Sequence, residues 1–202
     1  MGGAQKLTKQ GKARKQQLMH EAAKLFAHSG YYATRVIDIV KSAGVAKGLF
    51  YWYFENKETL FREIVQATRD DLRRAQAKAI EDETDPLKRI SKGIEASLRF
   101  TAENEHLYVL LRFAGTQDRF ASLIDDAQQV HASDTAVHIK EAIANGDITD
   151  EDPMLLAQGV VATVFHFARL RSTGAIPNDI DELSKFVSEF CLRGLGVTKS
   201  VN

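Results

Sequence analysis

Apolar side chains recur every three or four positions along almost the whole 202-residue chain, and no stretch keeps the alternation of a β-strand. This spacing matches the 3.6 residues of an α-helical turn, so the chain is predicted to be all-α. Two of the three prolines directly follow Asp85 and Asp152, where a proline can begin a helix without losing a hydrogen bond. We expect about nine helices and no sheet.

Glycine, proline and capping residues divide the chain into these helices. Thr34, Asn56 and Asp85 are each predicted to cap a helix N-terminus, and Asn178 or Asp179 is predicted to cap the last one. The expected helices span residues 12–28, 34–43, 46–53, 57–80, 86–104, 106–114, 116–145, 153–173 and 179–194.

Five consecutive aromatic residues begin at Phe50, shortly after Gly44, which is expected to supply a positive φ in a turn. A helix advances about 100° per residue, so these five side chains point all round its axis and cannot all be buried. Phe50 and Phe54 are one turn apart and are expected inside, which leaves the three between them partly outside. Two short helices joined through a glycine, the second rich in aromatics and lysine, are typical of a DNA-binding helix-turn-helix. For Trp52, packing in the core is the alternative.

The formal net charge of zero conceals a basic and an acidic part of the chain. Residues 1–57 contain ten Lys and Arg against three acids, a net charge of +7, which leaves −7 on residues 58–202. Such asymmetry is typical of a protein that binds nucleic acid at one end. The alternative for the basic stretch 6–15 is a solvated tail.

Other classes of protein are disfavoured by what the sequence lacks. The single Cys191 excludes an internal disulfide framework, fits a cytoplasmic protein and is expected in the core. No apolar run approaches the roughly 18 residues of a membrane span, and no signal peptide is evident, so no membrane partner is predicted. No G-x-S-x-G, Walker, G-x-G-x-x-G, H-E-x-x-H or C-x-x-C motif occurs. We therefore predict neither an enzyme nor a cofactor.

A metal site was considered for His131, Asp134, His138 and Glu141, whose spacing places them on one side of a helix. The two histidines are seven residues apart, which corresponds to about 10 Å along a helix. This separation is too large for both to bind one metal ion. We predict no metal site and expect a solvated helix face.

A stretch of the N-terminal part closely resembles the TetR family of bacterial transcriptional regulators. The resemblance covers about residues 14–65, and beyond it only the helix count, the proline and glycine positions and the closing 192–196 are similar. Two positions depart from the family, which usually has Ser or Thr where Ala46 stands and commonly Thr where Leu49 stands. The matching residues are Ala33-Thr34, Asp38-Ile39, Ala43-Gly44-Val45, Lys47-Gly48, Tyr51, Tyr53-Phe54, Asn56-Lys57-Glu58 and Leu60-Phe61.

The resemblance implies a three-helix DNA-binding head over residues 1–57 and a larger helical body over residues 58–202 that binds a ligand and forms a homodimer. It implies a ligand-responsive regulator, a repressor released from a near-palindromic double-stranded DNA operator when a small, hydrophobic molecule binds the body. Activation is the alternative to repression. A dimer that binds a small molecule but no longer reads DNA specifically is a further alternative, because of Ala46 and Leu49.

The predicted DNA contacts come from the family register and from charge. By register, Thr34 and Lys57 match phosphate contacts, and the segment 47–53 matches the recognition helix. Three basic residues at the start of the first helix can follow the adjacent backbone or minor groove. Ile37 can contact a thymine methyl group, with burial as the alternative. The predicted contacts are Lys12, Arg14, Lys15, Thr34, Arg35, Ile37, Lys47, Gly48, Leu49, Tyr51, Trp52, Tyr53 and Lys57.

The ligand pocket is expected among the fifth to eighth helices, where the family places it. Arg112 is the sharpest candidate, because a partly buried guanidinium binds a carboxylate or phosphate. Its alternative is an ion pair with Glu95 or Glu105, and Arg169 could instead complement a helix dipole. The ligand candidates are Phe100, His106, Tyr108, Arg112, Phe113, Phe165, His166 and Arg169.

The last two expected helices are apolar on several sides, so each needs more than one packing partner. Pairing with their copies in a second subunit would form a four-helix interface, as the family resemblance also implies. An intramolecular core is the alternative. The predicted interface residues are Leu155, Leu156, Val160, Val164, Leu183, Phe186, Val187 and Phe190.

Overall fold

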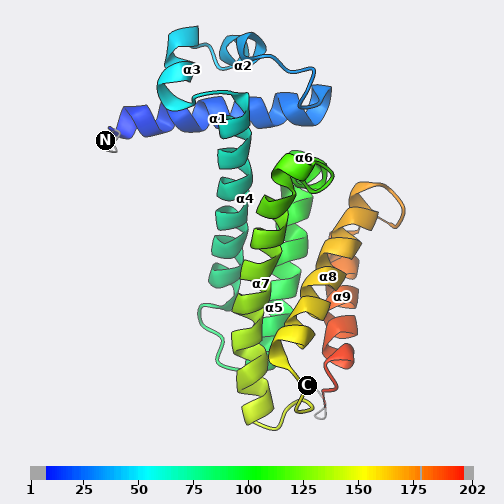
Figure 1. Ribbon diagram of the computed structural model, residues 1–202. Helices are drawn as coiled ribbons and strands as arrows, with labels where there is room; N and C mark the ends of the chain where they lie inside the picture. The colour runs from blue at the N-terminus through cyan, green and yellow to red at the C-terminus, as the bar shows by residue number, and fades with distance from the viewer. Residues whose placement is uncertain (1–7, 178, 198–202) are drawn as a thin grey trace. The chain divides into compact units, whose positions relative to one another are not determined.

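The computed structural model describes residues 8–177 and 179–197, and every regular element in these ranges is an α-helix (Figure 1). The all-α prediction is confirmed, and so is the expected number of nine helices in the described ranges. The helices are α1 (Lys9–Ser29), α2 (Val36–Ser42), α3 (Lys47–Tyr53), α4 (Lys57–Ile80), α5 (Pro86–Glu103), α6 (Glu105–Gly115), α7 (Asp118–Ala144), α8 (Pro153–Ser172) and α9 (Ile180–Gly194).

Polar side chains cap the start of several helices. Asp85, Asp152 and Asp179 each accept hydrogen bonds from two backbone amides in the first turn of α5, α8 and α9, at 2.8–3.3 Å. Asn56 accepts one at the start of α4, at 2.9 Å from the amide three residues later. These side chains satisfy amides that have no partner within the helix, which confirms the caps predicted there. The alternative cap for α9, Asn178, lies outside the described residues.

Three predicted helix starts are corrected. The first helix begins three residues early, because the Thr8 hydroxyl accepts a hydrogen bond from the Gly11 amide at 3.1 Å. The seventh begins two residues late, at Asp118. The second begins after Arg35, whose own amide donates to a carboxylate three residues later at 3.0 Å, so the predicted cap at Thr34 is wrong.

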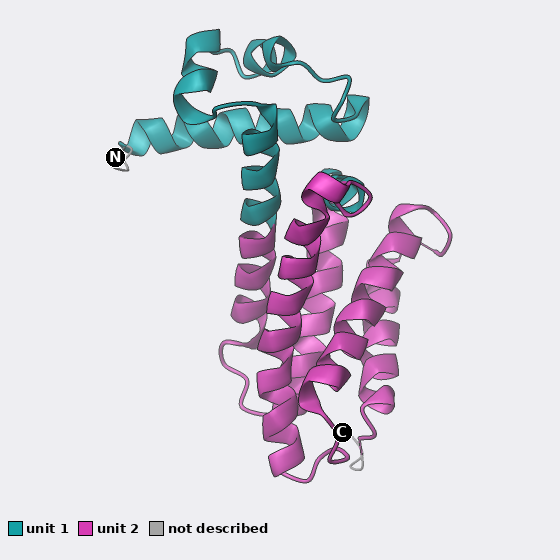
Figure 2. Ribbon diagram, in the orientation of Figure 1, with its two compact units in different colours: residues 1–68, 106–113 teal, residues 69–105, 114–202 magenta. Residues whose placement is uncertain are grey.

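The helices form two compact units (Figure 2). Unit 1 comprises residues 1–68 and 106–113, and unit 2 comprises residues 69–105 and 114–202, as far as these ranges are described. This division differs from the predicted boundary after residue 57 in two ways. Helix α4 is continuous past that point and contributes to both units, and most of α6 belongs with the first three helices.

An aromatic cluster joins α1, α4 and α6 within unit 1. The ring of Phe61 lies 5.7 Å from that of Phe26, 5.1 Å from that of Tyr31 and 5.8 Å from that of Phe113, measured between centroids and edge to face. Tyr31 also stacks on Phe113 at 5.6 Å. These contacts explain why α6 packs with the N-terminal helices, since aromatic pairs contribute stability beyond the area they bury.

Helices α5, α7, α8 and α9 run alongside one another in unit 2 (Figure 1). The close helix pairs there are α7–α8, α5–α9, α5–α7, α5–α8 and α8–α9. None of the close pairs in the described part of the chain includes α4. The distal half of α4 therefore lies less close to its neighbours than these helices lie to one another.

Helix α8 is strongly apolar but only partly buried within the chain. By length and composition alone it could cross a membrane, contrary to the sequence-based expectation, although a single helix of this kind is weak support for a membrane protein. Only 22% of its most apolar window is buried within the chain. The large apolar side chains of α8 are buried or half-buried, apart from Leu155, which is 71% exposed.

The turn between α2 and α3 depends on a glycine. Gly44 has a φ of +61°, as predicted, a left-handed conformation that other residues adopt at a cost. Gly48, inside α3, has an ordinary helical φ, and a Cβ added there would meet no atom within 4 Å.

We expect Gly44→Ala to lower the free energy of unfolding by about 1–2 kcal/mol, because alanine resists the left-handed conformation. The matched variant Gly48→Ala should be neutral or stabilising by up to about 1 kcal/mol, since alanine favours a helix. Urea unfolding followed by circular dichroism would measure both. Equal effects of the two substitutions would contradict this account of the turn.

Candidate nucleic-acid interface and ligand pocket

The aromatic run of α3 divides between core and surface. Phe50 and Phe54 are 0% and 1% exposed, whereas Tyr51 and Trp52 are 51% and 55% exposed. The prediction that Phe50 and Phe54, the first and last aromatics of the run, are buried is confirmed. Packing of Trp52 in the core is excluded. The helix starts after Ala46, which makes no side-chain capping bond.

The exposed side of α3 combines a cation with aromatic rings. Lys47 is exposed, and its ammonium lies 5.9 Å from the centroid of the Tyr51 ring. Gly48 is also exposed, and Leu49 is half-buried. In α2, Ile37 is 37% exposed, so it is not fully buried. This side can offer a charge, a hydroxyl and apolar edges to a partner, which are the groups that contact DNA phosphates and base edges.

Two predicted contact residues, Thr34 and Tyr53, use their hydroxyl groups inside unit 1. The Thr34 hydroxyl donates to the carbonyl of Gly30 at 2.8 Å, and the residue is only 3% exposed. The Tyr53 hydroxyl donates to the carbonyl of Gly11 at 2.8 Å. These geometries assign the two hydroxyls structural roles, contrary to the expectation that they bind phosphate.

Lys57 also has a structural role. Its ammonium donates to the carbonyl oxygens of Tyr31 and Thr34 at 2.6 and 2.8 Å, and it lies 4.3 Å from the centroid of the Tyr31 ring. The first residue of α4 therefore ties that helix to the loop before α2. A phosphate would have to compete with two carbonyls for this charge, so the predicted phosphate contact is not supported.

The remaining basic candidates differ in how far their charge is available. Arg35 is exposed but forms a bidentate ion pair with Asp38 at 3.0 Å, and its hydrogen bonds lower the pKa of that carboxyl. Lys15 is paired with Glu63. Lys12 and Arg14 are exposed, and all three basic residues lie within α1. Arg14 donates to a glutamine side chain at 2.9 Å.

A cavity of about 730 Å³ lies within unit 2. This volume falls in the range of about 300–1,000 Å³ that is usual for small-molecule sites. Its walls come from α4, α5, α7 and α8, and 11 of the 23 lining residues are polar: five are charged, two are histidines, three carry hydroxyls and one is a glutamine. The lining residues are Asp70, Leu72, Arg73, Arg74, Gln76, Ala77, Ile80, Arg89, Ile90, Gly93, Ile94, Ser97, Thr101, His131, Asp134, Thr135, Val137, His138, Val160, Val161, Val164, Phe165 and Ala168.

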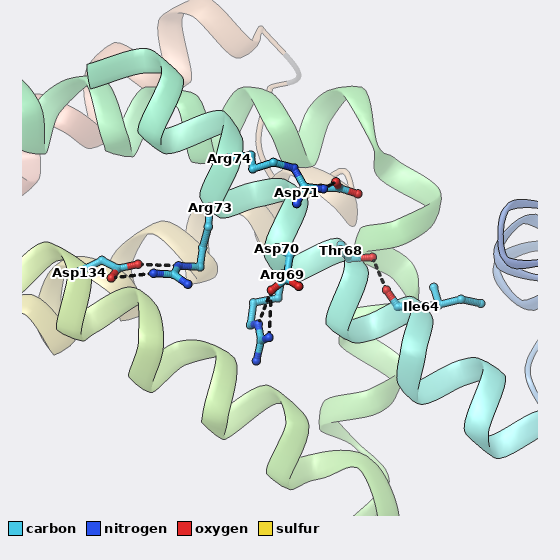
Figure 3. A network of polar contacts seen from close by, with 8 residues as sticks. All are labelled: Ile64, Thr68, Arg69, Asp70, Asp71, Arg73, Arg74 and Asp134. Carbon is cyan, nitrogen blue, oxygen red and sulfur yellow. Dashed lines mark hydrogen bonds and ion pairs between the residues drawn. The ribbon is translucent and has the colours of Figure 1, made fainter. Parts of the chain in front are cut away.

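The arginines of this cavity are all held by acidic side chains. Arg73 of α4 makes two hydrogen bonds to Asp134 of α7, at 2.8 and 3.1 Å (Figure 3). Arg74 pairs with Asp71 on its own helix (Figure 3). Arg89 binds a carboxylate of α7 at 2.9 Å and a backbone carbonyl at 2.6 Å. Arg73 thus links α4 to another helix of unit 2 through an ion pair.

Two histidines of α7 also line the cavity. Burial lowers the pKa of His131, which is 4% exposed, and the pKa of the half-buried His138. Both rings are therefore neutral at pH 7. Within the described ranges, Nδ1 of each ring is buried without a hydrogen-bond partner. The helix face that we expected to be solvated thus turns partly toward the cavity.

Of the eight predicted ligand residues, only Phe165 lines the cavity. Four others are on the part of α6 that belongs to unit 1, where Tyr108 is buried, Phe113 joins the aromatic cluster and Arg112 is exposed rather than partly buried. The fourth is His106, whose ring lies 6.2 Å from that of a histidine of α1. None of these four lines the cavity of unit 2, because most of α6 joins unit 1, which the sequence could not show. The remaining three, outside the cavity lining, are the half-buried Phe100 and the exposed His166 and Arg169.

The cavity residues that were not predicted have no sequence pattern that clearly distinguishes them from surface residues. Arg73 and Arg89 lie in helices with many charges, so nothing distinguished them from surface residues. His131 and Asp134 were noticed for their spacing, but the spacing alone does not tell a solvated face from a cavity wall. Burial of His131 decides the question.

The predicted interface residues fall into two groups. Leu155, Phe186 and Phe190 are 71%, 49% and 47% exposed, and the two phenylalanine rings stack 6.3 Å apart. Val160 and Val164, in contrast, line the cavity. Leu183 and Val187 are buried in unit 2, and Leu156 is half-buried. The exposed group alone leaves apolar surface for a partner.

Removal of the Lys57 charge should destabilise the protein more than removal of the Lys47 charge. We expect Lys57→Gln to lower the free energy of unfolding by about 1.5–3 kcal/mol, because two carbonyls lose a charged donor. Lys47→Gln should change it by less than about 0.5 kcal/mol, as is usual at an exposed site. Urea unfolding would measure both, and a larger effect at Lys47 would contradict the structural role of Lys57.

Comparison with known proteins agrees with this organisation. The sequence profile described as "Bacterial regulatory proteins, tetR family" matches residues 18–64, the segment that contains α2, α3 and the start of α4. The transcriptional repressor KstR2 of Mycolicibacterium smegmatis is 31% identical over 99 residues, which cover 49% of this chain and 48% of the relative. The regulator HbdR of Aromatoleum is 31% identical over 41% of this chain and 36% of its own length. The chain thus aligns with less than half of each of these two curated relatives.

Solved structures are similar over nearly the full chain. A TetR-family regulator from Syntrophomonas wolfei has a TM-score of 0.81 at 21% identity and covers 95% of this chain and 99% of its own. FadR from Bacillus subtilis, solved with stearoyl-CoA, has a TM-score of 0.80 at 21% identity over 89% of this chain and 98% of its own. At this identity the similarity concerns the fold. Residues 18–64 of the chain thus match the TetR family of bacterial regulatory proteins, and the chain as a whole has the fold of solved TetR-family regulators.

Proposed function

We propose that the protein is a ligand-responsive DNA-binding regulator of transcription in the cytoplasm, and that it acts as a repressor. The observation that carries the proposal is the outward side of α3, where Lys47, Tyr51 and Trp52 are exposed while the flanking phenylalanines anchor the helix. A short helix held by its buried side and exposing a cation and aromatic rings fits the major groove, which is about 12 Å wide.

The other proposed DNA contacts are made by basic side chains whose charge is exposed. Lys12 and Arg14 are exposed near the start of α1, and Arg35 is exposed beside α2. We assign these three to the DNA backbone, which contributes affinity without sequence information. Ile37 and Leu49 are assigned apolar contacts with base edges. Thr34, Tyr53 and Lys57 are assigned to the support of this surface, because their polar groups bind backbone carbonyls.

The protein acts as a homodimer in this proposal. Leu155 of α8 and Phe186 and Phe190 of α9 are exposed apolar groups that a second copy would cover. A two-fold axis relates identical patches, so the same residues meet their own copies. The dimer would place two recognition helices about 34–36 Å apart, one turn of DNA, on a near-palindromic operator.

Ligand binding in the cavity of unit 2 would weaken operator binding. Helix α4 lines the cavity and also contributes to unit 1, so it is a covalent connection that can carry the change. A ligand shifts such an equilibrium only by the difference in its affinity for the two states. KstR2 of M. smegmatis is named a repressor, which favours repression over activation for this chain.

The DNA-binding proposal is tested with DNA fragments from upstream of the protein's own gene. Binding of the protein to these fragments is measured by fluorescence anisotropy at several salt concentrations. We expect Lys47→Gln and Trp52→Ala each to weaken specific binding about tenfold, as expected for loss of one good contact. If Lys47 binds a phosphate, the slope of log K against log salt should fall by about 0.9. Lys24→Gln, an exposed lysine of α1 next to a glutamate, is the matched control and should bind normally. Equal affinity for specific and random fragments would contradict the proposal.

The dimer is tested by sedimentation at micromolar concentration. We expect the native chain to be a dimer and the double variant Phe186→Glu, Phe190→Glu to be a monomer with unchanged helical content, because both side chains are exposed in the single chain. Ser133→Glu, which adds the same acid to an exposed position of α7, should remain a dimer. A native monomer would contradict the homodimer, and a dimer that tolerates both phenylalanine substitutions would show that the interface is elsewhere.

A further inference from the structure

The cavity of unit 2 is elongated along α4. Asp70 and Ile80 both line it, and ten residues of helix correspond to about 15 Å. The wall opposite is formed by apolar side chains of α5 and α8, among them Ile94, Val164 and Phe165. A long apolar body fits such a space better than a compact polar molecule does.

Polar contacts hold α4 over this cavity. Arg73 pairs with Asp134 of α7, as the dashed lines of Figure 3 show, and the Gln76 amide donates to the Ser97 hydroxyl of α5 at 2.9 Å. Because α4 forms no close helix pair in the described chain, these side-chain contacts carry much of its attachment to unit 2. A molecule that entered beside α4 would meet them.

The pair of Arg73 and Asp134 is well placed to exchange partners. Its side chains are 47% and 48% exposed, and pairs this exposed are typically worth about 0–1 kcal/mol, so little is lost when one acid replaces another. Arg69 and Arg74 pair within α4, and Arg89 is additionally held by a backbone carbonyl at 2.6 Å. Arg73 is therefore the guanidinium whose release would also free α4.

The cations of the lining are three arginines, each already paired with a carboxylate, so an anionic ligand would bind by replacing one of these acids. Three arginines and two aspartates line the cavity, and burial keeps both histidines uncharged at pH 7. His131 lies one turn before Asp134 on α7, so a buried neutral ring with an unpartnered nitrogen is close to the ion pair. A ligand head group that contains a carboxylate or phosphate would bring oxygen atoms close to the His131 ring and to the Arg73 guanidinium.

We infer that the cavity binds an elongated amphiphile with one carboxylate or phosphate group, and that this group displaces Asp134 from Arg73. The apolar body then occupies the space between α4, α5 and α8. The exchange replaces the ion pair between α4 and α7 with a contact to the ligand, so α4 is no longer held by α7. This inference names the effector class and the switch of the proposed function, and its regulatory half depends on that proposal.

Three probes with the same dodecyl chain test the ligand class: dodecanoate, dodecyl phosphate and 1-dodecanol. Each is titrated into the full-length protein by calorimetry at micromolar concentration. We expect at least one of the two anions to bind ten or more times more tightly than the alcohol, and the preferred anion identifies the head group. Tighter or equal binding of the alcohol, or no binding of any probe, would overturn the inference.

Two variants of the same ion pair distinguish an exchanging contact from a structural one. Arg73→Gln should weaken binding of the preferred anion about tenfold or more, since a charge-assisted bond is lost, and leave the alcohol unchanged. Asp134→Asn should instead strengthen anion binding by about two- to fivefold, because the competing acid is removed. A purely structural pair would give both variants the same sign. Arg99→Gln, which breaks an exposed pair between α5 and α9 outside the cavity lining, is the control and should have no effect.

The two proposals fail separately. If the anion preference and the opposite effects of the two variants are found, but the bound anion does not change DNA affinity, the ligand class stands and the regulatory function is overturned. If DNA binding is specific but Arg73→Gln leaves anion binding unchanged, the regulator stands and the exchange is overturned.

Discussion

The aromatic cluster centred on Phe61 is the constraint on which unit 1 depends. It brings together Phe26 of α1, Tyr31 of the following loop and Phe113 of α6, segments far apart in the sequence. The same Tyr31 accepts a hydrogen bond at its carbonyl from Lys57 and packs its ring under that ammonium. The base of the helix-turn-helix is thus fixed by packing and by a half-buried charge, and the exposed side of α3 takes no part in these contacts.

Polar groups near the surface assigned to DNA are therefore of two kinds: some already bind the protein's own backbone, and others are exposed to a partner. Thr34, Tyr53 and Lys57 have motif positions that suggest contact with DNA, yet each donates to a backbone carbonyl. Lys47 and Trp52, by contrast, are exposed. A motif identifies the segment that meets a partner, but hydrogen-bond partners decide which of its side chains can take part.

Features that depend on residues close together in the sequence could be predicted, whereas features that depend on distant helices could not. Helix starts at Asp85 and Asp152, the turn at Gly44 and the inward rings of Phe50 and Phe54 depend on neighbours within one or two turns, and all were anticipated correctly. The cavity depends on which faces of α4, α5, α7 and α8 meet, and no local pattern records that. The α6 residues were misassigned for the same reason, since a short apolar helix can pack equally well on either side.

Trp52 is the single tryptophan of the chain, and it lies 55% exposed on α3 with its ring 4.6 Å from that of Tyr53. All tryptophan emission of this protein therefore originates at one known surface position. Its wavelength and its quenching by added solutes report the local environment of that position without any label. The molecule carries its own optical probe at the surface assigned to DNA.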